Sequence, residues 1–182
     1  MSKIRLLYER FGAENYYRDH ADEYANPHLP EIADLLGRNL HRLDCGGGGV
    51  LDFSAGGGEV TLALQKLHVG NISGCDPFTF DLYAKNTGQP CLRHSFEDVL
   101  KGAPLGHFSL IISSFALHLC PAKDLWPLTW HLFQAAPTLV IITPHKRPEL
   151  ENLPGIQLIW EDYSLTERGK KVRMKAYRMA IC

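Results

Sequence analysis

The sequence lacks the features of a membrane-spanning, disulfide-bonded or zinc-binding protein. None of its apolar runs is long enough to cross a bilayer, and residues 1–10 lack the apolar core of a secretory signal. Its five cysteines are an odd number at scattered positions, without a C-x-x-C pair. We therefore expect reduced thiols, no metal site and a cytoplasmic protein.

An excess of charge is also missing. The chain has 19 Lys and Arg against 20 Asp and Glu, a formal net charge of -1, so we expect no general nucleic-acid-binding surface. Basic residues concentrate only near the C-terminus, where a strand would turn Lys171, Arg173 and Lys175 to one side. That side is either a solvated edge protected from aggregation or a face for phosphate or acidic groups.

What the sequence does have is enough apolar residues, 45% of 182, for one domain with a sizeable core. The glycine run 46–49 divides it into two parts. Before the run, Pro30 precedes apolar residues spaced by three and four over 31–36, which predicts an amphipathic helix. We predict one domain over residues 1–182, with a core from 50 to 182 and a helical lid or substrate segment over 1–45.

After the glycine run, short apolar stretches alternate with helix-like ones. Strands are predicted at residues 50–53, 71–75, 91–94, 108–113 and 139–142, and helices at 60–67, 80–86 and 123–136. We expect the last helix to be broken or kinked near Pro127. This alternation predicts a parallel sheet covered on both faces, and the runs 156–163 and 172–181 add a β-hairpin.

The segment 50–59, Val-Leu-Asp-Phe-Ser-Ala-Gly-Gly-Gly-Glu, leads from a strand through small residues into a helix. Such a turn lets backbone amides approach a ligand and presents a helix N-terminus to it. A tight structural turn would have the same pattern. Thr61 stands where a dinucleotide-binding fingerprint has its third Gly or Ala, so that fingerprint fails.

Two aspartates near the turn are candidates for ligand binding. Asp52 ends the first predicted strand, and Asp76 follows 24 residues later at the end of the second. A carboxylate there can accept hydrogen bonds from both ribose hydroxyls of an adenosine, although a turn or cap residue before Pro77 would look alike. We expect replacement of Asp76 by alanine to weaken cofactor binding, with little change in stability if Asp76 is exposed in the cleft.

This combination resembles the class I methyltransferase family, whose members use S-adenosylmethionine (SAM). In that family an acidic strand end precedes a G-x-G-x-G turn. The likeness runs from Val50 to about Ile142, and the terminal hairpin is similar to the family's last two strands. It implies SAM as cofactor and a Rossmann-like α/β fold. The sheet would be seven-stranded and mostly parallel, with an antiparallel last strand, and flanked by helices.

The resemblance also implies a set of cofactor-binding residues, in the following roles. Asp52 would support the amino group of SAM through water, and Asp76 would hold the ribose. The methionine part would lie along Ser54, Ala55, Gly56 and Gly58, the adenine against Pro77, Phe78, Ser95 and Phe96, and the methyl group near Ser114.

The chain departs from the family in places. Ser54 replaces the first glycine of the turn, and Ser95 and Ser109 stand where many members have Asp. These departures motivate one alternative, a non-catalytic methyltransferase-like interaction or regulatory subunit. The basic hairpin motivates another, an RNA or protein methyltransferase. Residues 113–118, Ser-Ser-Phe-Ala-Leu-His, differ from the N-P-P-[YFW] motif and resemble the small-molecule branch. The resulting interpretation is methyl transfer from SAM to an unidentified small-molecule acceptor.

Candidate catalytic residues follow from position. His118 comes four residues after Ser114, and its imidazole suits removal of a proton near neutral pH. Tyr17 and His145 are the next candidates. Alternatively, His118 only lines the loop and a nucleophilic acceptor needs no base. The aromatic patch around Tyr17 is either a lid over the site or a helix docked on the sheet.

Overall fold

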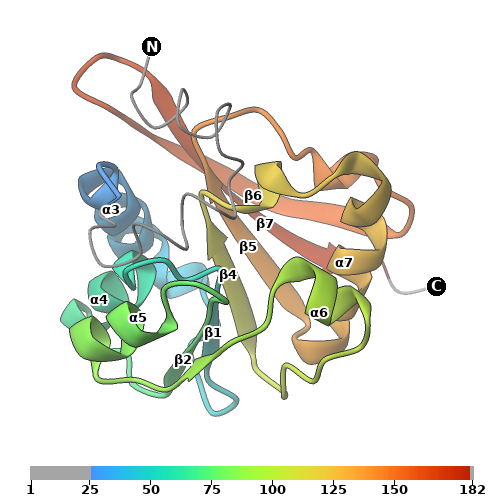
Figure 1. The fold of residues 1–182 in the computed structure, drawn as a ribbon. Helices are drawn as coiled ribbons and strands as arrows, with labels where there is room; N and C mark the ends of the chain where they lie inside the picture. Colours follow the sequence, from blue (N-terminus) through green and yellow to red (C-terminus); the bar gives the residue numbers. More distant parts are fainter. Residues whose placement is uncertain (1–25, 181–182) are drawn as a thin grey trace, which may run out of the picture.

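The computed structural model describes residues 26–180. Seven strands form one sheet in the order β3-β2-β1-β4-β5-β7-β6 (Figure 1). The strands are β1 (Val50–Phe53), β2 (Ile72–Cys75), β3 (Cys91–Leu92), β4 (Leu110–Ser114), β5 (Thr138–Thr143), β6 (Ile156–Leu165) and β7 (Lys171–Met179). Neighbours from β3 to β5 are parallel, and β7 is antiparallel to both β5 and β6. The predicted Rossmann-like sheet with a terminal hairpin is confirmed.

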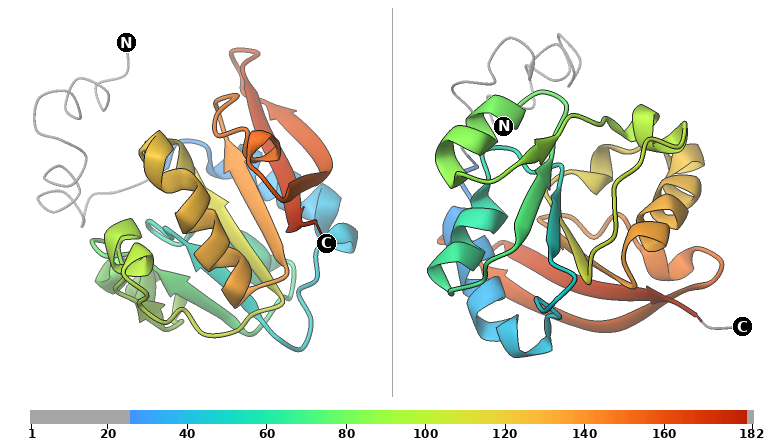
Figure 2. Two further views of the ribbon diagram at one scale, coloured as in Figure 1. Left: turned by 90° about the vertical axis from the view of Figure 1, so that its right-hand side faces the viewer. Right: turned by 90° about the horizontal axis from the view of Figure 1, so that it is seen from below.

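Helices cover the two faces of the sheet. They are α3 (Leu29–Asn39), α4 (Glu59–Lys66), α5 (Phe80–Thr87), α6 (Phe96–Leu100) and α7 (Ala122–Ala135), with 3-10 turns η2 (Leu40–Arg42), η3 (Leu117–Leu119) and η4 (Leu150–Asn152). Figure 2 shows α3, α4 and α5 on one side of the sheet and α6 and α7 on the other. None of the helices between residues 26 and 180 is long and apolar enough to cross a membrane.

Side chains point alternately to the two faces of the sheet, so the apolar core consists of two clusters, one on each face. On β4, Leu110 and Ile112 join the cluster beneath α3 and α4, whereas Ile111 joins the cluster beneath α6 and α7. Successive side chains of a strand point to opposite faces, so a sheet covered on both sides needs apolar residues at every position. The near-continuous apolar runs of β4 and β5 meet this need.

Two helices differ from the prediction. The proposed break in the helix of residues 123–136 is not observed, because α7 continues through Pro127. Helix α6 was not among the predicted helices. Its start carries a capping box in which Ser95 and Asp98 bond each other's backbone amides, and the Ser-x-x-Asp pattern could have announced it.

The basic residues of the terminal hairpin, Lys171, Arg173 and Lys175, contact acidic or aromatic side chains of the protein. Arg173 pairs with Glu161 at 3.5 Å, and Lys175, only 5% exposed, pairs with Glu151 at 2.9 Å. The ammonium of Lys171 lies 4.1 Å from the centre of the Tyr163 ring. Most of the positive charge on this strand therefore has a partner within the protein.

Candidate cofactor and acceptor site

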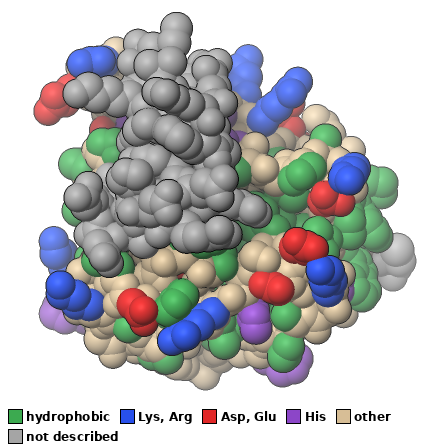
Figure 3. All heavy atoms as spheres, viewed as in Figure 1, with side chains coloured by type: hydrophobic (Ala, Val, Ile, Leu, Met, Phe, Trp, Pro, Cys, Tyr) green, Lys and Arg blue, Asp and Glu red, His purple; other side chains and the backbone are tan. Residues whose placement is uncertain are grey.

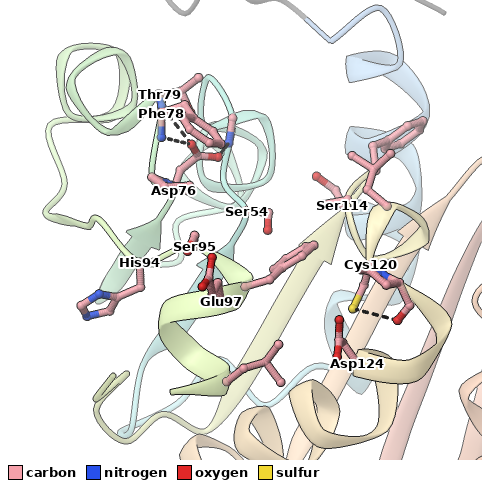
Figure 4. Close-up of a pocket in the computed structure, with 18 residues that line it drawn as sticks. Ser54, Asp76, Phe78, Thr79, His94, Ser95, Glu97, Ser114, Cys120 and Asp124 are labelled. Carbon is pink, nitrogen blue, oxygen red and sulfur yellow. Dashed lines mark hydrogen bonds between the residues drawn. The ribbon is translucent and has the colours of Figure 1, made fainter. Parts of the chain in front are cut away.

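A cavity of about 580 Å³ lies at the carboxyl ends of β1, β2 and β4 (Figure 4). Cofactor and small-molecule sites in proteins typically measure roughly 300–1,000 Å³. Its walls come from the turn after β1, the start of α5, the start of α6 and the loop between β4 and α7. The lining residues are Ser54, Gly56, Asp76, Pro77, Phe78, Thr79, His94, Ser95, Phe96, Glu97, Leu100, Ser114, Phe115, Ala116, Leu119, Cys120, Pro121 and Asp124.

The turn after β1 is anchored on β2. The amides of Ser54 and Ala55 both donate to the Cys75 carbonyl, at 2.8 and 3.1 Å. Ser54 and Gly56 both have a left-handed backbone, with φ of 60° and 57°. Glycine adopts this conformation freely and serine does not, so Ser54, where the resemblance expects a glycine, keeps the glycine-like backbone at a cost in strain.

Asp76 joins the turn to helix α5. One carboxylate oxygen, Oδ1, accepts from the amides of Phe78 and Thr79, each at 2.9 Å, and Oδ2 accepts from the Gly56 amide at 3.1 Å. A carboxylate has about four acceptor positions, so these three bonds leave one, on Oδ2. Since Asp76 is 8% exposed and holds three amides, the expectation that its loss would spare stability does not fit the structure.

Asp52 lies behind the turn and does not line the cavity. Its Oδ2 accepts from the Thr61 amide at 3.2 Å and hydroxyl at 2.8 Å, and the Thr61 hydroxyl also contacts the Tyr83 hydroxyl at 2.9 Å. Its Oδ1 is buried and has no partner among the described residues. Burial raises the pKa of Asp52 to about 8, and the nearby carboxylates of Glu59 and Asp76 add to the shift.

Gly58 faces away from the cavity. It precedes α4 with a φ of 90°, and a Cβ there would lie 2.4 Å from Cγ2 of Thr87 and 3.2 Å from the Tyr83 ring. The structure thus explains this glycine by the packing of α5 against the turn. Ala55 is likewise buried and does not line the cavity.

The wall at the start of α6 holds Ser95 and Phe96. The Ser95 hydroxyl donates to Asp98 Oδ2 at 2.8 Å and accepts from the Asp98 amide at 3.1 Å. The Phe96 ring stacks on Phe53 at 5.8 Å between centroids. This places an apolar ring in the cavity wall while the neighbouring hydroxyl serves the helix cap.

The opposite wall begins at Ser114, which is 8% exposed. After it, Phe115 has a φ of 57°, a rare conformation for a bulky residue that is often found at functional sites. The His28 ring stacks on the Phe115 ring at 4.9 Å, and the Asn26 amide donates to Glu59 at 3.1 Å. The segment before α3 therefore packs beside the cavity.

His118 and His145 meet behind this wall. Their ring centroids lie 4.8 Å apart, and Nδ1 of His118 is buried without a partner in the described part of the chain. Burial, assisted by His145, lowers the pKa of His118 to about 4, so its imidazole is neutral at pH 7. Neither histidine lines the cavity.

The structure thus brings most of the predicted cofactor residues to one cavity. Asp52, Ala55 and Gly58 lie behind the first wall, which is formed by the turn after β1 and the start of α5. Tyr17 lies outside the described residues. Sequence reasoning missed Thr79 and Asp124, which belong to helix starts whose place beside the turn only the fold reveals. Between residues 26 and 180 no cluster of three or more potential metal ligands occurs, and the cysteines described there are free thiols.

No protein-family profile matches the chain. An uncharacterized protein of Schizosaccharomyces pombe is 28% identical over 184 aligned residues, which cover 77% of this chain and 74% of that protein.

Solved structures of methyltransferases share the fold of this chain. Magnesium protoporphyrin IX methyltransferase from Synechocystis PCC 6803 with bound SAM matches over 98% of each chain, at 12% identity and a TM-score of 0.66. The chain has the class I methyltransferase fold. N-methyltransferase NodS from Bradyrhizobium japonicum, in complex with S-adenosylhomocysteine (SAH), matches at 13% identity and 0.66 over 96% of this chain and 97% of that one. A putative RNA methyltransferase from Pyrococcus horikoshii matches at 16% identity and 0.64, over 87% and 88%.

Within this methyltransferase fold, the cavity lies where open α/β sheets bind ligands. Strand order reverses between β1 and β4, and the carboxyl ends of these two strands border the cavity. The fold alone therefore accounts for the position of the site, and the residues around it decide what the site can hold.

Proposed function

We propose that this protein is a SAM-dependent methyltransferase that acts on a small-molecule acceptor. The observation that carries the proposal is the position of Asp76. Its carboxylate links the glycine turn to α5, faces the cavity and keeps one acceptor position for a ligand hydroxyl. The neighbours crystallised with SAM or SAH support a cofactor of this kind.

A second observation supports the fit of SAM. The buried Oδ1 of Asp52 lacks a partner among the described residues, and a buried oxygen without a hydrogen bond is costly. The ammonium group of SAM, through a water molecule, would satisfy it. Ser54, Gly56 and Ser114 would then border the methionine part of the cofactor.

Bound SAM would supply a methyl group on a positively charged sulfur: an acceptor atom would bond to the methyl carbon in line with the carbon–sulfur bond, which breaks and leaves SAH. The protein's part is to hold cofactor and acceptor in line and to keep water out. His118 is the proposed base because its neutral imidazole lies just behind the wall of Ser114 and Phe115; since it does not line the cavity, it would act through a water molecule or after a movement of that wall. His145 contacts it and is the next candidate, together with Tyr17.

Calorimetry tests the cofactor. We expect SAM and SAH to bind and NADH to leave no signal. Tight binding of NADH without binding of SAM would reject the proposal. If SAH binds but a broad panel of hydroxyl, amine and thiol acceptors is never methylated, the non-catalytic subunit that Ser54 and Ser95 suggested gains support.

The acceptor is proposed to be small rather than nucleic acid. Arg173 and Lys175 are paired with carboxylates, and Figure 3 shows acidic side chains interspersed with basic ones on the visible face. The similarity to a putative RNA methyltransferase keeps RNA as the second candidate. Sub-micromolar tRNA binding near physiological salt would favour it, because neutralised phosphates dominate such affinity.

The proposal treats residues 1–182 as one domain in which residues 1–45 cover the site. The stack of His28 on Phe115 supports this arrangement at the cavity edge. The free thiols among the described residues agree with the proposed cytoplasmic location.

A further inference from the structure

Three carboxylates line the cavity, and one of them has no partner. Asp76 holds three backbone amides, and Glu97 pairs with Lys101 at 2.6 Å. The side-chain carboxylate of Asp124, in the first turn of α7, forms no hydrogen bond or ion pair with any residue between 26 and 180, although the Asp124 amide donates to the Pro121 carbonyl at 2.9 Å. Figure 4 shows Asp124 directed into the cavity from the side opposite Asp76. The free carboxylate therefore faces the space a ligand would fill.

On the wall across from Asp124, the acceptors at the start of α6 already have partners within the protein, Lys101 for Glu97 and Asp98 for Ser95. Ser95 uses its hydroxyl in both directions to cap α6, donating to the Asp98 carboxylate and accepting from the Asp98 amide. One neutral lone pair is all that remains on that oxygen. A purine amino group entering between these walls would find its strong acceptor on α7.

We propose that Asp124 reads the base of the cofactor, by accepting a hydrogen bond from the 6-amino group of adenine. This inference rests on the proposed function. The carboxylate accepts from an amino group, but opposite the 6-oxo group of hypoxanthine two acceptors would face each other. Phe96 and Leu119, which also line the cavity, supply apolar surface for the flat ring. Asp124 would thus select adenine over a 6-oxo purine.

A structural role for Asp124 leads to a different expectation. A carboxylate in the first turn also stabilises a helix through the helix dipole. That effect would change the stability of α7 and leave the preference between two purines untouched. The ratio of two affinities therefore separates the two roles.

The test compares SAH with S-inosylhomocysteine, its 6-oxo counterpart, by calorimetry. We expect the wild-type protein to prefer SAH by about 10- to 100-fold, as for a hydrogen bond to a charged acceptor. Asp124→Asn should reduce the preference to about threefold or less, because an amide can face either group. Glu97→Gln is the matched control, since its carboxylate lines the same cavity but already has a partner, and it should keep the wild-type ratio.

The outcomes are distinct. An unchanged ratio in Asp124→Asn, with normal thermal unfolding, overturns the role of Asp124 and leaves the proposed function standing. A wild-type protein that binds neither nucleoside overturns the proposed function and this inference with it.

Discussion

The two walls of the cavity are built differently. On the first, the Ser54 amide donates to the Cys75 carbonyl, and the amides of Gly56 and Thr79 donate to the Asp76 carboxylate. On the second, the carboxylate of Asp124 faces the cavity without a partner among the described residues, and behind that wall Nδ1 of His118 is buried without one. The first wall is thus held mainly by bonds within the protein, with one acceptor position of Asp76 and the buried Thr79 hydroxyl left over, whereas the second wall turns a whole unpaired carboxylate toward the cavity. Substitutions that remove the Asp76 bonds or disturb the packing behind the first wall should destabilise the fold, and replacement of Asp124 on the second should change binding alone.

The largest effect is expected at Gly58. Gly58→Val forces a branched residue into a φ of 90° and drives its Cβ into Thr87. We expect a loss of about 4 kcal/mol or more in the free energy of unfolding, measured by urea denaturation, together with loss of SAH binding. Gly88→Val is the control, because Gly88 is also left-handed, at 70°, but has open space around its Cβ. A similar loss in both variants would mean that backbone strain, not the packing of α5, explains Gly58.

Next comes Asp76. Asp76→Ala removes the acceptor of three amides, one buried and two partly buried, so we expect a loss of about 2–4 kcal/mol in stability and at least a tenfold weaker affinity for SAH. Calorimetry and thermal unfolding on the same sample measure the two effects. Asp124→Asn, on the opposite wall, should unfold at the wild-type temperature. An Asp76→Ala protein of full stability would break the comparison between the walls.

Asp52 should give the first wall a pH dependence. Its folded-state pKa of about 8 exceeds its ordinary value of 3.8, so the folded protein holds this proton more tightly than the unfolded chain does. The contribution of Asp52 to stability is therefore greatest below pH 4 and falls as the pH rises toward 8, by up to about 1.4 kcal/mol per pH unit. Asp52→Asn should flatten the fall between pH 5 and 8 in urea titrations. A slope equal to that of the wild-type protein would show that another group is responsible.

The smallest effect is expected at Ser54. Ser54→Gly relieves a left-handed serine, and we expect a gain of about 0.5–1 kcal/mol in stability with SAH affinity changed less than twofold. Thermal unfolding and calorimetry are again the measurements. A large drop in affinity would show that the serine hydroxyl, rather than its backbone, serves the cofactor.

Much of the fold could be predicted because it follows local patterns. The apolar runs of β4 and β5, the turn at Gly56 and the stop of α5 at Gly88 are visible within a few residues of sequence. The two-residue strand β3 and the short helix α6 are less visible, since so few residues carry little periodicity. Pro127 misled the prediction, because a helix held by tertiary contacts can tolerate one missing amide.

Most residues of the first wall could be predicted from the sequence, whereas Asp124 on the second wall could not. Gly56 and Asp76 belong to one strand–turn–helix–strand unit of the sequence, and the resemblance to methyltransferases predicted a role for both. Asp124 joins them only because β4 lies beside β1, so that the start of α7 faces the start of α6. No local signal in the sequence connects these distant segments.

The position of β7 between β5 and β6 has a consequence for the order of assembly. In the described sheet β6 pairs with β7 alone, and β7 follows it in the chain. During synthesis, residues 156–165 therefore emerge before the strand that attaches them to the sheet. Until β7 docks on β5, the outward-facing Ile159, Tyr163 and Leu165 belong to an unattached strand that other chains could pair with.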